Sequence, residues 1–143
     1  MFSREEAKKL RQEFWTTFGK EYPHKWMLYN TGIKEIQLKF TFERKYAQVS
    51  LDIIEEDELI RAYYFEKLES LKSILETDYH LSEIIFDKDY ELSEGKIVSR
   101  IYVHLDKVSI YNKKDWPRVK EFLYQKMLLL EDFFSDFSDY IRN

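Results

Sequence analysis

The sequence predicts an α+β fold in which helices pack on an antiparallel sheet. Three features support this class: a capped apolar repeat near the N-terminus, two pairs of segments in which apolar and polar residues alternate, and a long apolar repeat at the C-terminus. The expected order of elements is α-β-β-β-α-β-β-α. No linker or internal repeat divides the sequence, so residues 1–143 are expected to form a single domain.

The first helix is expected from about Arg4 to Phe18. Ser3 and Glu6 have the spacing of a capping box, in which each side chain accepts a hydrogen bond from a free amide at the start of the helix. Apolar residues then recur every four positions up to Phe18, and Gly19 is expected to stop the helix in a left-handed conformation.

Three strands are expected next. The short apolar stretch 26–29 predicts the first of them. Apolar and polar residues alternate strictly over 36–42 and again over 47–53, on either side of Arg44 and Lys45. This pattern predicts a hairpin with one wet face, lying beside the first strand.

A second helix and a second hairpin follow. Asp57 is placed to cap a helix that runs to about Glu76. Extended segments at 84–86 and 97–105 flank the turn 93–95 and predict the hairpin. Two further apolar residues are expected to extend the sheet, Val108 and Ile110.

The last helix is expected from Trp116 to Ile141, after a cap at Asp115. It is apolar on two sides, whereas packing on one face needs only one stripe. The first stripe consists of Val119, Leu123, Met127, Leu130, Phe134, Phe137 and Ile141. The second stripe consists of Phe122, Leu129, Phe133 and Tyr140. Either both stripes are buried within one chain, or the second one forms a homodimer across a two-fold axis.

The composition excludes several classes of protein. The chain has no cysteine, so it contains no disulfide and no thiolate metal site. No apolar run approaches the roughly 20 residues that a membrane span requires, and the N-terminus does not resemble a secretion signal. We therefore expect a cytoplasmic protein without membrane contact.

The net charge of −4 is unevenly distributed. Residues 1–18, 19–51, 52–91 and 92–143 carry net charges of +1, +3, −9 and +1. A dedicated DNA-binding protein normally has a clear positive excess, so nucleic-acid binding is the less favoured hypothesis. Its candidate basic patch consists of Lys20, Lys25, Lys34, Lys39, Arg44 and Lys45. A stacking groove is an alternative, formed by Trp15, Trp26 and Tyr29.

The sequence assigns no catalytic, cofactor-binding or metal-binding residue. Asp52, Glu55 and Asp57 offer oxygen ligands for a divalent cation, but helix capping and solvated charge explain them equally well. The scattered glycines build neither a nucleophile elbow nor a phosphate-binding loop, so no cofactor is expected. Three histidines lie too far apart in the sequence for a local metal pair: His24, His80 and His104.

The expected element order is similar to that of the PD-(D/E)XK nucleases, which hold a metal through acids on the second and third strands of a meander. Here Gln48 and Ser50 stand where the acid and the lysine of the third strand would be, and neither binds Mg²⁺ strongly. A nuclease would require carboxylates to converge with a lysine, for instance Glu35, Glu43 and Asp52. We expect a nuclease-like topology without the residues that carry out the metal-dependent reaction.

A set of segments spread along the whole sequence carries a family resemblance. The set comprises Phe2-Ser3 with Glu5-Glu6-Ala7, Phe14-Trp15 with Phe18-Gly19, Lys25-Trp26 with Leu28-Tyr29-Asn30-Thr31, residues 47–53, Ser99-Arg100-Ile101-Tyr102-Val103, and Trp116 with Phe122-Leu123. These segments resemble an uncharacterised bacterial family, catalogued as domain of unknown function 4268. Similar domains are appended to larger nuclease-like or restriction-associated proteins, which implies an accessory or recognition role.

The sequence therefore favours a non-enzymatic binding or protein-interaction module, and the resemblance places it beside restriction or defence-type systems. The alternative hypothesis is a metal-dependent or degenerate nuclease-like domain that acts on DNA.

Overall fold

The computed structural model describes residues 2–143 and confirms the α+β class. The described elements are α1 (Arg4–Glu21), β1 (Ile36–Phe42), β2 (Tyr46–Ile53), α2 (Glu58–Ser70), α3 (Lys72–Thr77), β3 (Ile85–Glu91), β4 (Ile97–Asp106), the 3-10 turn η1 (Lys113–Asp115) and α4 (Trp116–Arg142).

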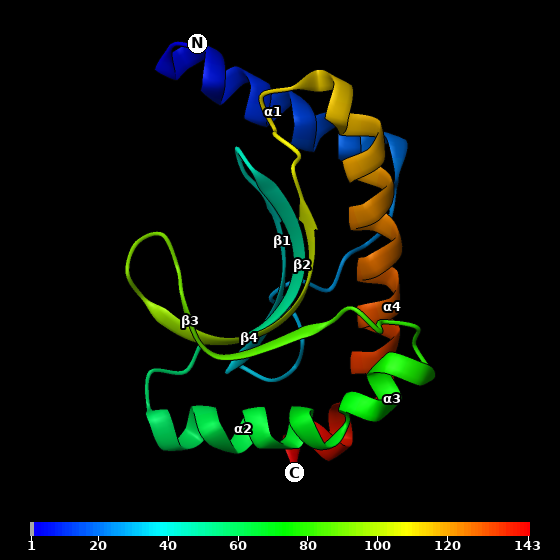
Figure 1. Ribbon diagram of the computed structural model, residues 1–143. Helices are drawn as coiled ribbons and strands as arrows, with labels where there is room; N and C mark the ends of the chain where they lie inside the picture. Colours follow the sequence, from blue (N-terminus) through cyan, green and yellow to red (C-terminus); the bar gives the residue numbers. More distant parts are fainter. Residues whose placement is uncertain (1) are drawn as a thin grey trace.

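The four strands form one antiparallel sheet in the order β1-β2-β4-β3. Both predicted hairpins are present, with Ile36 opposite Ile53 in the first and Ile85 opposite Tyr102 in the second. The sheet is strongly curved, and α4 runs along its convex side while α1 and α2 lie across its two ends (Figure 1). The concave side of the sheet therefore faces away from α4.

Alternation along the strands assigns the convex face of the sheet to the core. On β2, the four apolar side chains between Ala47 and Ile53 are each 0 % exposed and belong to the main hydrophobic cluster. The side chains between them point to the concave face. Gln48, Ser50 and Asp52 are polar, yet they too are almost fully buried. A sheet face of this kind needs polar partners for its buried groups.

The last helix buries most of the first predicted stripe and part of the second within one chain. In the second stripe, Phe133 is 0 % exposed, Phe122 and Leu129 are half-buried, and Tyr140 is 48 % exposed. Phe133 packs edge-on against Tyr79, with ring centroids 5.5 Å apart. Phe133 is therefore not accessible to a second copy. The homodimer stays a prediction, and it would depend on the other three residues.

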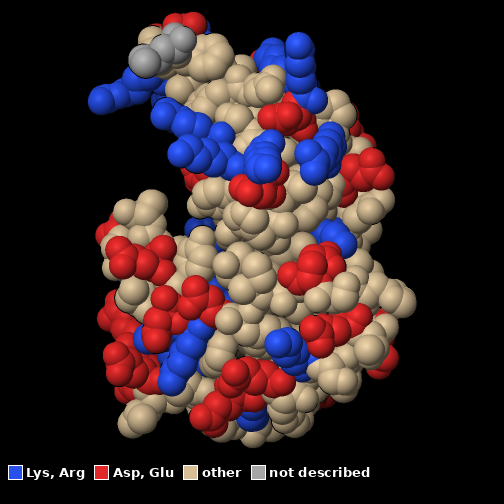
Figure 2. Space-filling model, viewed as in Figure 1, with Lys and Arg blue, Asp and Glu red and all other residues tan. Residues whose placement is uncertain are grey.

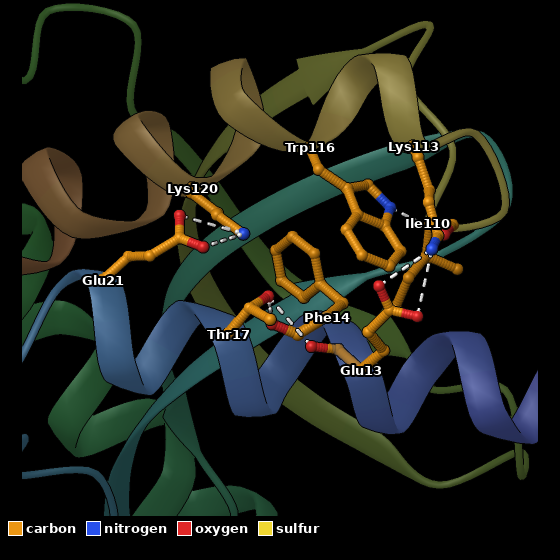
Figure 3. Close-up of polar contacts among 8 residues, drawn as sticks. All are labelled: Glu13, Phe14, Thr17, Glu21, Ile110, Lys113, Trp116 and Lys120. Carbon is orange, nitrogen blue, oxygen red and sulfur yellow. Dashed lines mark hydrogen bonds and ion pairs between the residues drawn. The ribbon is translucent and has the colours of Figure 1, made fainter.

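Two lysine–glutamate pairs hold α1 against η1 and the start of α4 (Figure 3). Lys120 bonds Glu21 at 3.0 Å, and Lys113 bonds Glu13 at 2.8 Å. Both ammonium groups also lie over the ring of Trp116, at 5.7 and 5.4 Å from its centroid. These contacts fix the angle at which α1 crosses the end of the sheet.

The predicted stop at Gly19 is wrong. The helix α1 continues through Gly19 to Glu21, and its cap is Tyr22. The pair between Glu21 and Lys120 explains the extra turn, because it holds the last helical residue against α4. Such tertiary contacts are invisible in the local pattern around a glycine.

The predicted first strand is also wrong, because residues 26–29 form a loop beside the edge of β1. Leu28 has φ 47°, a left-handed conformation that interrupts an extended segment. The Leu28 carbonyl accepts a hydrogen bond from the amide of Leu38 at 2.9 Å. The amide of Met27 donates to the side chain of Glu131 at 2.6 Å instead of to a strand. The three-strand meander of the nuclease comparison is thus a two-strand hairpin.

Two smaller differences concern the second half of the chain. The helix capped by Asp57 forms as α2 and α3, because the amide of Leu71 bonds the carbonyl of Leu68 in a tighter turn. Val108 and Ile110 are buried beside the turn between β1 and β2 without forming a strand.

The burial of the second stripe predicts opposite outcomes for two substitutions on α4. Phe133→Ala removes a fully buried ring and should lower the free energy of unfolding by about 3–5 kcal/mol. Tyr140→Ala lies on the same helix at a half-exposed position and should cost about 1 kcal/mol or less. Urea unfolding measures both values, and equal losses would show that the packing described for Phe133 is incorrect.

Candidate functional site

The concave side of the sheet contains a hollow of about 350 Å³, here called the groove. It lies between the β1–β2 hairpin and the β3–β4 hairpin, and Figure 2 shows the molecule hollowed on this side. The lining consists of Lys39, Thr41, Glu43, Arg44, Lys45, Tyr46, Tyr90, Glu91, Leu92, Ser93, Glu94 and Arg100.

Arg100 forms the floor of the groove and is only 2 % exposed. It stands directly across from Asp52 in the pairing of β2 with β4. Its Nε and Nη2 donate to the two carboxylate oxygens of Asp52 at 2.8 Å each, and its Nη1 donates to Gln48 Oε1 at 2.9 Å. This is the two-pronged geometry that makes guanidinium–carboxylate pairs strong and directional. Two of the three buried polar residues of β2, Asp52 and Gln48, thus have their partner, whereas the hydroxyl of Ser50 has none among the described residues.

Burial lowers the pKa of the Arg100 guanidinium, but the hydrogen bonds and negative charge of Asp52 outweigh this effect and raise the pKa above its ordinary value. The ring of Tyr90 lies over the guanidinium, 4.2 Å from carbon to centroid. Because Tyr90 comes from the edge strand β3, this stack attaches β3 to the middle of the sheet.

Tyrosines and a histidine surround Arg100 on the same face. Tyr102 packs edge-on against Tyr90 at 5.4 Å, and Tyr46 stacks on His104 at 5.3 Å. Burial raises the pKa of Tyr46 and of Tyr102 above the ordinary value. These phenols therefore stay protonated at neutral pH and offer hydroxyl groups for hydrogen bonding.

The two walls of the groove carry opposite charges. The β1–β2 wall presents Lys39, Arg44 and Lys45, with Glu43 beside them. The β3–β4 wall presents acidic residues, Glu91 and Glu94, both exposed. On the face drawn in Figure 2, Lys and Arg gather over α1 above the hollow, and Asp and Glu are more numerous below it.

A second hollow, of about 340 Å³, lies at the free edge of β1. Trp15 and Tyr29 line it together with Lys39, so the structure brings together two of the three aromatic residues predicted to stack on bases. Trp26 does not join them. Its ring packs edge-on against Phe40 at 5.2 Å as part of the core surroundings.

The loop that carries Tyr29 is held in place by Glu131 of α4, which is 9 % exposed. Its carboxylate accepts from the amide of Met27 at 2.6 Å and pairs with His24 Nε2 at 2.9 Å. One buried carboxylate thus anchors this loop against the long helix.

The predicted basic patch is divided between several parts of the surface. Lys39, Arg44 and Lys45 line the groove. The other three predicted lysines are exposed outside it: Lys20, Lys25 and Lys34.

The carboxylates considered for a metal are each engaged elsewhere. Asp52 is bound to Arg100, Asp57 caps α2 by accepting from the amide of Leu59 at 2.9 Å, and Glu55 accepts from a neighbouring amide. Within residues 2–143, no group of three His, Asp or Glu side chains is placed to hold a metal ion.

The convergence required by the nuclease hypothesis is absent from the described residues. Glu35 and Glu43 flank the two ends of β1, so they are separated by about 26 Å along the strand at the rise of about 3.3 Å per residue. Asp52 is 1 % exposed and held by Arg100, so it does not open into a cleft shared with them.

Arg100 and Tyr90 were not singled out by the sequence. Asp52 and Arg100 are opposite charges at polar positions of two predicted hairpins, which was the available signal. These two charges can be matched only if β2 is known to pair with β4. The alternation of residues within each strand does not predict the order of strands in the sheet.

A family model described as Domain of unknown function (DUF4268) matches residues 10–138 of the chain. No solved structure matches it. None of the helices within residues 2–143 has the length and apolar character of a membrane span.

The geometry at Arg100 predicts a large effect of a nearly isosteric change. Asp52→Asn leaves a buried guanidinium without its counter-charge and should lower the free energy of unfolding by about 3–5 kcal/mol. The matched control is Glu13→Gln, which breaks the exposed pair with Lys113 and should cost about 1 kcal/mol or less. Chemical unfolding measures both, and an Asp52→Asn protein as stable as the control would contradict the buried pair.

Proposed function

This chain belongs to the DUF4268 family of domains of unknown function, and we propose that it is a non-enzymatic binding module. Its binding surface is the groove on the concave face of the sheet, and its ligand is a segment of polypeptide. The single observation that carries this proposal is the construction of the groove: a rigid polar floor between two walls of opposite charge.

The floor is suited to holding a ligand in one orientation. Asp52 and Gln48 fix Arg100, which uses three of its five donors on them. The tyrosines beside it combine flat apolar rings with hydroxyl groups. Tyrosine and arginine are among the residue types enriched in protein–protein interfaces and in the residues that contribute most to their affinity.

The walls favour a polypeptide over a polyanion in this groove. Glu91 and Glu94 would repel a chain of phosphates, and Lys39, Arg44 and Lys45 would repel a purely basic one. A peptide that carries acidic and basic residues in separate places can pair with both walls at once. Charge pairing of this kind selects the partner and its direction more than it adds affinity.

Two expectations from the sequence continue as predictions beside this proposal. The family resemblance implies an accessory role in restriction or defence-type systems, in which the groove would receive part of a larger protein. The homodimer through Phe122, Leu129 and Tyr140 is a separate surface on α4.

Selection from a random peptide library on the immobilised domain tests the proposal. We expect enriched peptides to carry both charges and to bind the Glu91→Lys/Glu94→Lys variant at least about tenfold more weakly, equivalent to about 1.4 kcal/mol. The matched control is Glu66→Lys/Glu69→Lys on α2, which makes the same change in net charge at exposed positions outside the groove. Binding to the control should change less than about twofold.

Two results would count against the groove. One is a selection in which no peptide is enriched. The other is a set of enriched peptides that bind both charge variants equally, because their attachment would then depend on net charge or on another surface.

A further inference from the structure

A second surface joins the outer face of α1 to the edge of β1. Its residues are Lys8, Arg11, Trp15, Tyr29 and Lys39, here called the strip. A shallow hollow of about 700 Å³ lies against α1 beside Lys8, Arg11 and Trp15, and the hollow of about 340 Å³ described above lies beside Trp15, Tyr29 and Lys39. Trp15 lines both, so the two hollows are neighbours on either side of this residue.

Helical spacing explains why the basic residues and the tryptophan of α1 share one face. Lys8, Arg11 and Trp15 are three and four residues apart, which places them on one side of the helix. Phe14 and Phe18 border this face on the side that packs against the core, and they are 0 % and 4 % exposed.

The two aromatic residues of the strip offer surfaces of different kinds. Trp15 is half-buried and is held edge-on by Phe14, with ring centroids 4.9 Å apart. Tyr29 is 76 % exposed, at the tip of the loop that Glu131 anchors. A fixed ring and an exposed ring on the two sides of one hollow can each stack on a flat partner.

The charge around the strip favours an anionic partner. Residues 1–51 contain ten Lys and Arg against six Asp and Glu. Glu13 of α1 is already neutralised by Lys113 at 2.8 Å. The acidic part of the chain lies toward the opposite end of the molecule, as Figure 2 shows. The strip therefore has a local positive excess although the whole protein is acidic.

We propose that the strip binds single-stranded nucleic acid, with bases stacked on Trp15 and Tyr29 and phosphates paired with Lys8, Arg11 and Lys39. Rings that alternate with cations are the combination by which proteins hold an unpaired strand without reading its sequence. A duplex keeps its bases stacked on one another, so it gains only the phosphate contacts. This site shares only Lys39 with the peptide groove, and it goes beyond the proposed function.

Fluorescence anisotropy of a labelled oligothymidylate with the full chain at low salt tests this inference. We expect saturable binding that weakens steeply as salt increases, and weaker binding of a duplex of the same length. Lys8→Gln/Arg11→Gln should flatten the plot of log affinity against log salt by about 1.4, because each lost cation removes about 0.7 from the slope. Tyr29→Ala should weaken binding at least about fivefold.

Matched controls separate the strip from general effects. Lys72→Gln/Lys88→Gln removes the same charge from exposed positions in the acidic segment and should leave the salt slope unchanged. Tyr63→Ala removes a tyrosine that is 46 % exposed on α2 and should leave the affinity unchanged. Circular dichroism of each variant confirms that it is folded.

Three results would overturn the inference: no saturable binding of the oligonucleotide at low salt, equal affinity for the duplex, or equal losses in the strip variants and their controls. The second result would indicate phosphate attraction without stacking. Because no substituted residue is shared with the peptide experiment, either proposal can fail while the other holds.

Discussion

The buried pair between Arg100 and Asp52 is the constraint on which the concave face depends. Three polar side chains of β2 are buried there, and a buried polar group without a partner is expensive. The guanidinium of Arg100 donates hydrogen bonds to two of them, Asp52 and Gln48. The ring of Tyr90 stacks on the same guanidinium. The desolvation of such a pair is tolerable only when the geometry is nearly ideal. The curvature of the sheet and the position of β3 must therefore place Asp52, Gln48 and Tyr90 where all three can contact the guanidinium of Arg100.

This constraint also shapes what the surface can do. The groove has a stiff floor, neutral phenols and two charged walls, and these are properties of a surface that orients a ligand. The buried carboxylate at its centre is committed to Arg100. At the other end of the sheet, α1 is fixed by two ion pairs across Trp116, so its outer face presents cations and a tryptophan in a constant arrangement. The net charge of −4 is small because positive and negative side chains largely cancel, although they gather toward opposite ends of the molecule.

Local patterns predicted the elements whose causes are local. The capping box at Ser3, the cap at Asp57 and both hairpins follow from spacing within a few residues. The predictions were wrong where a residue distant in the sequence determines the local structure. Lys120 stabilises α1 beyond Gly19, and Glu131 holds the stretch 26–29 as a loop. The candidate site was missed for the same reason, since Asp52 and Arg100 meet only after β2 pairs with β4. Of the three aromatic residues predicted to form a stacking groove, Trp15 and Tyr29 line one hollow because both flank the edge of β1, and Trp26 does not.

Amide hydrogen exchange in Arg100→Lys tests the central claim most directly, because lysine keeps the positive charge but cannot form the paired hydrogen bonds of a guanidinium. Without the paired bonds to Asp52 and the stack with Tyr90, β3 should open more readily than the junction of α1 with α4. We expect protection of the β3 amides to fall at least about 30-fold, equivalent to about 2 kcal/mol, with a smaller loss at that junction. Unchanged protection across β3 would contradict the account.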